Sequence, residues 1–351
     1  MDEVISKTYL EDIDIAGKDT NLPWAKFDNA NILITGASGL IGNCLVDILM
    51  SRENINYHVY ASGRNESRLR KLYEKYLGSP FFHIIVFDVT SELNSNIEFH
   101  YIFHAASGAN PIEYSTNPIG VIKGNIWGCE NLLTYGKTHN MRRFLYVSSG
   151  DVYGEGDGRI FTEEYSGYVN PLLVRSCYAA SKRTSESLCV SYYYQHNIDV
   201  VIARPCHTFG PHISDSAMRV FAQFMRNVEN NEEIVLKSRG EQFRSWCYVV
   251  DCAKGLLYIM LKGEVAQAYN IADSKSMLTI RELAEMFASY NNRNVRFDIP
   301  SEQESKGYNP ATKSILDNSK LQKLGWSTVG NIQSNIYKSI IEYTNCRRHK
   351  I

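Results

Sequence analysis

The stretch that decides the fold is 31-NILIT-35 followed directly by 36-GASGLIG-42. The apolar run predicts a strand covered on both faces, and residues 40–50 after the glycines predict a helix. Glycines at such a junction permit a sharp turn, close approach of the backbone to a pyrophosphate, and tight seating of the helix on the sheet. The helix N-terminus adds free N–H groups and a positive dipole end. The stretch therefore predicts a phosphate-binding turn.

The same alternation of strand and helix continues along the chain, which predicts parallel βαβ units and an α/β, Rossmann-type, doubly wound parallel sheet. Residues 29–205 form the expected dinucleotide-binding domain, after an N-terminal extension at 1–28 with one short helix. Residues 206–351 form mainly a smaller C-terminal lobe, with about 248–272 returning to the first domain. The remaining expected strands are 57–62, 83–87, 101–104, 144–148, 199–204 and 268–272, and the expected helices are 67–76, 120–138, 181–196, 217–227, 249–261 and 279–290, the last opened by a Thr279–Glu282 capping box.

Composition excludes several classes of protein. A formal net charge of −1 argues against nucleic-acid binding, which requires a basic surplus. No apolar run approaches the ~20 residues of a membrane span, and the acidic N-terminus does not resemble a signal peptide. The 8 cysteines form no CxxC pair and show no metal-ligand spacing, so we expect free thiols in the cytoplasm and no metal site.

The segment 178-YAASK-182 predicts acid–base chemistry. A Tyr and a Lys four residues apart share one helix face. A phenol with a pKa near ~10 is a poor base at neutral pH, and a nearby ammonium lowers that pKa. Tyr178 is then able to exchange a proton with a carbinol oxygen while hydride moves to or from a nicotinamide.

Further segments carry a family resemblance. The GxxGxxG spacing of the glycine turn and 148-SSGDVYG-154 resemble the extended branch of the short-chain dehydrogenase/reductase superfamily. The segments 203-ARPCHTFGP-211 and 243-FRSWCYVVD-251 resemble its sugar-nucleotide epimerase/dehydratase family. The resemblance implies an NAD(P)-dependent enzyme with Ser149, Tyr178 and Lys182 as catalytic residues and a nucleotide sugar as substrate.

The resemblance also assigns the cofactor contacts. The end of the second strand carries Gly63 and Arg64 where an NAD enzyme usually places a carboxylate, so Arg64 favours NADP(H) over NAD(H) by pairing with a 2′-phosphate. Arg204-Pro205 resembles the turn that meets the nicotinamide amide. The expected cofactor-binding residues are Gly36, Ser38, Gly39, Leu40, Ile41, Gly42, Arg64, Asp88, Val89, Ala105, Ala106, Tyr178, Lys182 and Pro205.

The expected substrate contacts lie on both halves of the chain. Arg244 matches the family arginine that meets a substrate phosphate, and Lys313 is a second basic candidate. His207 replaces the usual family Asn, and His104 is expected to be structural. The expected substrate-binding residues are Ser107, Asn125, Ser149, Gly150, Asp151, His207 and Arg244.

The reaction stays open between several alternatives. Gly150-Asp151 stands where 4,6-dehydratases of the family carry an Asp–Glu pair, which disfavours dehydration. The favoured reaction is reduction of a nucleotide-linked 4-keto-6-deoxyhexose. The alternatives are a 4-epimerase, a decarboxylase like those acting on UDP-glucuronate, which carry Glu at the position of Asp151, and a non-catalytic sensor or scaffold. The resemblance further implies a homodimer in which the helices 120–138 and 181–196 form a four-helix bundle.

Overall fold

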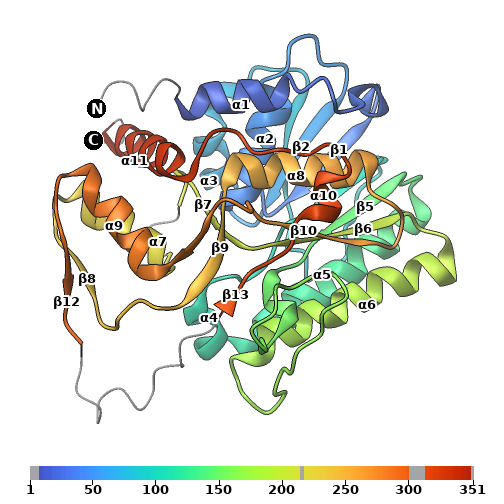
Figure 1. The fold of residues 1–351 in the computed structure, drawn as a ribbon. Coiled ribbons are helices and arrows are strands. Elements are labelled where there is room, and N and C mark those ends of the chain that lie inside the picture. The colour runs from blue at the N-terminus through green and yellow to red at the C-terminus, as the bar shows by residue number, and fades with distance from the viewer. Residues whose placement is uncertain (1–7, 214–216, 300–312, 349–351) are drawn as a thin grey trace.

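The computed structural model describes residues 8–213, 217–299 and 313–348 (Figure 1). Its centre is a seven-stranded parallel sheet in the order β10-β6-β5-β4-β1-β2-β3. The order reverses beside β1, so a topological switch point lies at the carboxyl end of this strand. The expected α/β doubly wound fold is confirmed. The strands are β1 (Asn31–Thr35), β2 (His58–Gly63), β3 (Phe82–Val86), β4 (Tyr101–His104), β5 (Arg143–Val147), β6 (Val200–Pro205) and β10 (Ala268–Ile271).

Helices cover both faces of this sheet, as Figure 1 shows. Successive side chains of a strand point to opposite faces. Ile32 and Ile34 therefore belong to the core beneath α2 and α8, and Leu33 belongs to the core beneath α5 and α6. The helices of the large sheet are α2 (Leu40–Met50), α3 (Glu66–Leu72), α4 (Pro111–Thr116), α5 (Pro118–Thr138), α6 (Ser176–His196) and α8 (Val249–Lys262).

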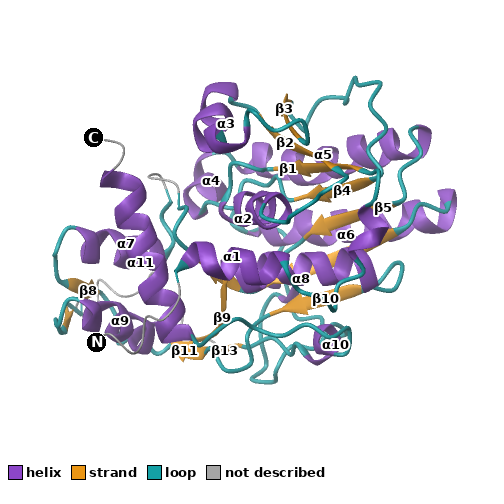
Figure 2. Ribbon diagram, turned by 90° about the horizontal axis from the view of Figure 1, so that it is seen from above, coloured by secondary structure: helices purple, strands orange, loops and turns teal. Residues whose placement is uncertain are grey.

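The smaller lobe is built around β9 (Phe243–Tyr248), beside which β7, β11 and β13 pair (Figure 2). A two-stranded sheet of β8 and β12 lies at its edge. The remaining elements are β7 (His207–Phe209), α7 (Val220–Glu229), β8 (Ile234–Leu236), β11 (Met277–Thr279), α9 (Ile280–Tyr290), β12 (Val295–Phe297), β13 (Lys313–Ser314), α10 (Ser319–Gln322) and α11 (Ile332–Arg348).

The N-terminal extension is docked by buried charges. Helix α1 (Tyr9–Gly17) contacts α2, α8 and α11, and Asp12 on it forms a 2.9 Å ion pair with Lys338 of α11. Asp19 pairs with Lys254 of α8 at 3.0 Å. None of the helices in the described ranges combines the length and apolarity of a bilayer span.

Several expected helix bounds were wrong. The helix expected at 67–76 ends at Leu72 and resumes as a 3₁₀ turn at 74–76, because buried Tyr73 turns inward and donates its hydroxyl to the Ala37 carbonyl at 2.7 Å. The helix expected from 217 begins at Val220. Helix α6 begins at Ser176 rather than 181, which places Tyr178 in its first turn. The capping box at Thr279 and Glu282 is present.

Candidate active site

The glycine turn joins β1 to α2 with the close contacts expected of a phosphate-binding loop. Gly36 has φ +68°, and a Cβ there would lie 2.7 Å from the backbone of Ala105 and Ala106. A Cβ on Gly42 would lie 2.4 Å from the Gly36 carbonyl oxygen. Gly39 caps α2 without a side chain. The N–H groups of the first turn of α2 are thus left for an external anion, and the turn fits a dinucleotide pyrophosphate.

A cavity of about 620 Å³ extends from this turn along the carboxyl ends of the strands. Arg64 and Asp88 lie at one end of its lining, both exposed. Hydrogen bonds from Thr90 lower the pKa of Asp88, and nearby Arg64 lowers it further. Among the expected cofactor residues, those that line the cavity are Gly36, Ser38, Gly39, Leu40, Arg64, Asp88, Val89, Ala105 and Ala106.

Tyr178 and Lys182 are both buried and lie one helical turn apart on α6. The Tyr178 ring is 5 % exposed and stacks on Tyr114 of α4, with ring centroids 4.9 Å apart. Lys182 Nζ donates to the Val147 carbonyl at 2.7 Å and lies 5.8 Å from the Tyr178 ring centroid. Ser149 follows β5 and accepts a hydrogen bond from the Asp151 amide at 3.1 Å. The chain thus brings Ser149, Tyr178 and Lys182 to the carboxyl end of β5.

The expected lowering of the Tyr178 pKa by Lys182 was wrong for this structure. Burial raises the pKa of Tyr178, and the charge of Asp151 raises it further, whereas hydrogen bonds with Ser149 and Ser107 lower it. Burial also lowers the pKa of Lys182 to about 7. The reason is that desolvation disfavours the charged form of both side chains.

Asn125 has a different role from the expected substrate contact. Its side chain is fully buried, accepts a hydrogen bond from Ser107 Oγ at 2.7 Å, and donates to Ser181 Oγ at 2.9 Å. The Asn125 amide on α5 therefore links the hydroxyl of Ser107 to Ser181 of α6. His104 is also structural as expected: it is buried, its Nδ1 lies 2.8 Å from Thr35 Oγ1, and burial lowers its pKa to about 3.

A second cavity of about 910 Å³, named here the substrate cavity, is lined by Ser149 and by residues of the smaller lobe. It shares four lining residues with the first: Ala109, Met218, Arg219 and Phe221. Pro205 lines this cavity rather than the first one. Its charged lining residues are four cations (Arg175, Arg219, Lys237 and Arg244) and one carboxylate (Asp151), a net charge of 4 − 1 = +3. Such a site favours a substrate with several negative charges.

His207 and Arg244 form a half-buried contact in this cavity. Arg244 Nη1 donates to His207 Nε2 at 3.0 Å. Burial lowers the pKa of His207 to about 3, and the charges of Arg244 and Arg219 act in the same direction. Among the described residues, no group pairs with the buried Nε of Arg244. Since an arginine buried with an unpaired donor is costly, this N–H is suited to a ligand oxygen.

Several lining residues were missed by sequence reasoning. Arg219 and Lys237 lie in no recognised segment, and Tyr114 is brought over Tyr178 only by the packing of α4 on α6. Arg175 had a signal, because it directly precedes the first turn of α6. Lys313, expected as a second basic contact, is exposed, and its neighbour Ser314 lines the cavity instead.

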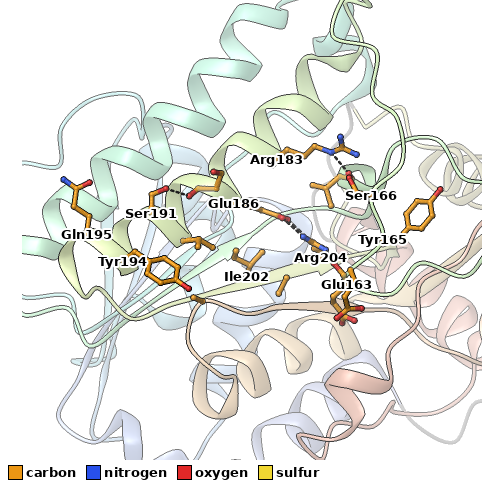
Figure 3. A pocket seen from close by; sticks show the side chains of 16 residues that line it. Glu163, Tyr165, Ser166, Arg183, Glu186, Ser191, Tyr194, Gln195, Ile202 and Arg204 are labelled. Carbon is orange, nitrogen blue, oxygen red and sulfur yellow. Dashed lines mark hydrogen bonds and ion pairs between the residues drawn. The ribbon is translucent and has the colours of Figure 1, made fainter.

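A third cavity, of about 770 Å³, is lined by α6, by β6 and by residues 163–166 (Figure 3). Its charged groups pair with the protein itself. Arg204 forms a two-pronged ion pair with Glu186, at 2.6 and 3.0 Å, and Arg183 donates to two backbone carbonyls. This cavity, named here the rear cavity, is separate from Tyr178 and from the glycine turn.

Residues 32–272 match the sequence model of the NAD dependent epimerase/dehydratase family. The chain belongs to this family. Its relatives include UDP-glucuronic acid decarboxylase 6 of Arabidopsis thaliana, 38% identical over 260 residues that cover 73% of each chain. UDP-glucuronic acid decarboxylase 1 of Xenopus tropicalis is 31% identical over 315 residues, covering 89% of this chain and 72% of the relative.

Solved structures share the fold at lower identity. UDP-glucose 4-epimerase of Thermotoga maritima, solved with UDP-glucose, superimposes with a TM-score of 0.76 at 22% identity, covering 91% of this chain and 99% of that one. The dTDP-glucose 4,6-dehydratase DesIV of Streptomyces venezuelae, solved with NAD, gives 0.76 at 21% identity, covering 91% and 98%. The chain is therefore an NAD(P)-dependent enzyme of the nucleotide-sugar epimerase/dehydratase type.

Proposed function

We propose that the protein oxidises UDP-glucuronate at C4 and removes its carboxylate. The net charge of +3 in the substrate cavity carries this proposal, because a diphosphate and a uronate carboxylate together bring three or so negative charges to the site. The relatives named as UDP-glucuronic acid decarboxylases support the same substrate. Among the alternatives drawn from the sequence, the decarboxylase thus replaces 4-keto reduction as the favoured one.

The side chains of the site supply the proton steps. A dinucleotide whose pyrophosphate is held at the glycine turn would supply the hydride acceptor and donor. The ionised form of Tyr178, a minor form because burial raises the pKa of this side chain, takes the proton of the C4 hydroxyl, with Ser149 orienting that oxygen. The resulting 4-ketone lies β to the carboxylate, so the C5–C6 bond breaks, carbon dioxide leaves, and the electron pair becomes an enolate. Asp151, the acidic side chain among the cavity-lining residues, would pass a proton taken from solvent to C5, so it is a carboxylate before and after the step.

The test is incubation of the purified protein and NAD with UDP-glucuronate. We expect carbon dioxide release and a UDP-pentose or UDP-4-ketopentose product. If the product is instead a C4 epimer that retains its carboxylate, the protein is an epimerase and not a decarboxylase. Absence of any product from UDP-sugars would overturn the proposal.

Reduction of a nucleotide-linked 4-keto-6-deoxyhexose is the second candidate, favoured by Arg64. Its exposed guanidinium lines the end of the dinucleotide cavity beside Gly63, a place suited to the 2′-phosphate of NADP(H). Arg64→Ala should then weaken NADPH binding about tenfold without changing NADH binding. Arg70, whose guanidinium pairs with Glu66 at 2.8 Å outside the cavity, gives the matched control Arg70→Ala. An equal loss of affinity for NADPH and NADH in Arg64→Ala would show that Arg64 does not select NADP(H).

We also propose a homodimer formed through α5 and α6. The side chains of Ile119 and Trp127 on α5 are 66% and 44% exposed, and Leu172, Leu173 and Val174 before α6 are exposed as well. Apolar surface of this extent beside the two helices suits a second copy of the chain. Light scattering should give twice the monomer mass, and Trp127→Glu should shift the mass toward the monomer.

A further inference from the structure

Three side chains of types that bind transition metals meet outside the residues that line the dinucleotide and substrate cavities. His212 follows β7, and Glu342 and Cys346 lie on α11. Each offers one ligand atom, and these atoms lie within 4.8 Å of one another. We propose that His212, Glu342 and Cys346 form a binding site for a divalent zinc-like ion. This proposal does not depend on the reaction proposed above.

The geometry requires little change to hold an ion. Glu342 and Cys346 stand four residues apart, so they share one face of α11. The Sγ of Cys346 lies 3.3 Å from Oε1 of Glu342. Ligands bound to Zn²⁺ at ~2.0–2.3 Å in a tetrahedron are separated by roughly 3.5 Å, close to that distance. The His212 ring is held edge-on against Tyr9 of α1, with centroids 5.2 Å apart.

The donor set selects the class of metal. An imidazole nitrogen, a carboxylate oxygen and a thiolate sulfur suit Zn²⁺ and Co²⁺, whereas Mg²⁺ and Ca²⁺ prefer oxygen ligands alone. Three protein ligands leave a fourth tetrahedral position for water. Binding would displace the thiol proton of Cys346, so affinity should rise with pH.

The position of the site suggests a role in holding the smaller lobe. His212 lies on the segment that follows β7, and β7 carries His207 of the substrate cavity. Glu342 and Cys346 belong to α11, which packs on α1, α7 and α9. A bound ion would therefore join the C-terminal helix to the strand that enters the substrate cavity, and should stabilise that lobe by mass action.

Cobalt absorption tests the proposal directly. Untagged protein, stripped with chelator, should bind one equivalent of Co²⁺ with a thiolate-to-cobalt charge-transfer band, and Zn²⁺ should displace it. Cys346→Ser should abolish the band, and His212→Ala should weaken binding about tenfold or more. His139→Ala, at a half-buried histidine of the C-cap of α5, is the control and should leave binding unchanged. A band that persists in Cys346→Ser would overturn the proposal.

A second measurement uses the unaltered chain, so it does not depend on a variant folding. Cys346 is half-buried, whereas the other seven cysteines are buried. Alkylation should therefore modify Cys346 first, and Zn²⁺ should slow its modification about tenfold because a metal-bound thiolate is a poorer nucleophile. Peptide mass spectrometry locates the label. Labelling of Cys346 at the same rate with and without Zn²⁺ would exclude the site.

Discussion

The substrate cavity and the rear cavity are both lined by charged side chains, which are balanced by ion pairs in the rear cavity and left with an excess of cations in the substrate cavity. In the rear cavity, Arg204 and Glu186 are 14% and 11% exposed and neutralise each other. In the substrate cavity, the half-buried Arg244 lies beside a neutral imidazole, and four cations face one carboxylate. Similar volume therefore does not indicate similar function. Buried charges that pair with each other belong to the structure of the fold, whereas an excess of one charge in a cavity favours binding of an oppositely charged ligand.

The two regions should differ most in turnover when one tyrosine hydroxyl is removed from each. Tyr178→Phe deletes the proton carrier, and we expect turnover to fall by about 10³-fold while dinucleotide binding is kept. Tyr165→Phe, which removes a hydroxyl bonded to the Glu155 carbonyl in the rear cavity, should leave turnover within about twofold. Steady-state kinetics and dinucleotide titration measure both. Near-normal turnover of Tyr178→Phe would refute the assignment of the active site.

The next largest effect concerns stability. Arg204→Met leaves Glu186 buried and unpaired, so the free energy of unfolding should fall by about 3–5 kcal/mol. The double variant Arg204→Met/Glu186→Gln should recover part of this loss, because it removes the uncompensated charge. Urea unfolding measures both. A loss below about 1 kcal/mol in the single variant would mean that the pair contributes no more than a surface ion pair.

The same replacement of an arginine by methionine in the substrate cavity should weaken substrate binding rather than lower stability. Arg244→Met removes a charged donor whose Nε has no partner among the described residues. We expect the KM for the nucleotide sugar to rise about 10- to 100-fold, with stability unchanged within about 1 kcal/mol. Kinetics and urea unfolding of the same preparation separate the two effects. Loss of stability without a change in KM would make Arg244 a structural residue.

The smallest effect is a pH dependence. The pKa of His207 is lowered to about 3 in the fold from an ordinary value near 6.5. Between these values the unfolded chain binds the proton that the folded chain does not, so the stability due to His207 is complete above pH 6.5 and is lost as the pH falls toward 3. His207→Asn should reduce this acid sensitivity, as thermal melts from pH 7 to pH 4 would record. An unchanged profile would assign the sensitivity to other groups, such as His104.

Local sequence determined the fold and the centre of the site. The glycine turn, the alternating strands and helices, and Tyr178 with Lys182 act over a few residues, where steric limits and the helical repeat leave few alternatives. Ser149 was placed by its resemblance to a family segment. The expected fold class was therefore confirmed, and the errors in the expected fold lay in helix bounds such as the break at Tyr73.

Only the tertiary structure decided which residues from distant parts of the sequence lie close together in space. Arg175, Arg219, Lys237 and Arg244 come from separate segments of the chain and meet in one cavity. Burial also raised the pKa of Tyr178, opposite to the direction expected from its spacing with Lys182, and lowered the pKa of Lys182. His212 and Cys346 likewise meet only in the fold. The physical reason is that charge and desolvation act through space, so they depend on neighbours that sequence separation does not specify.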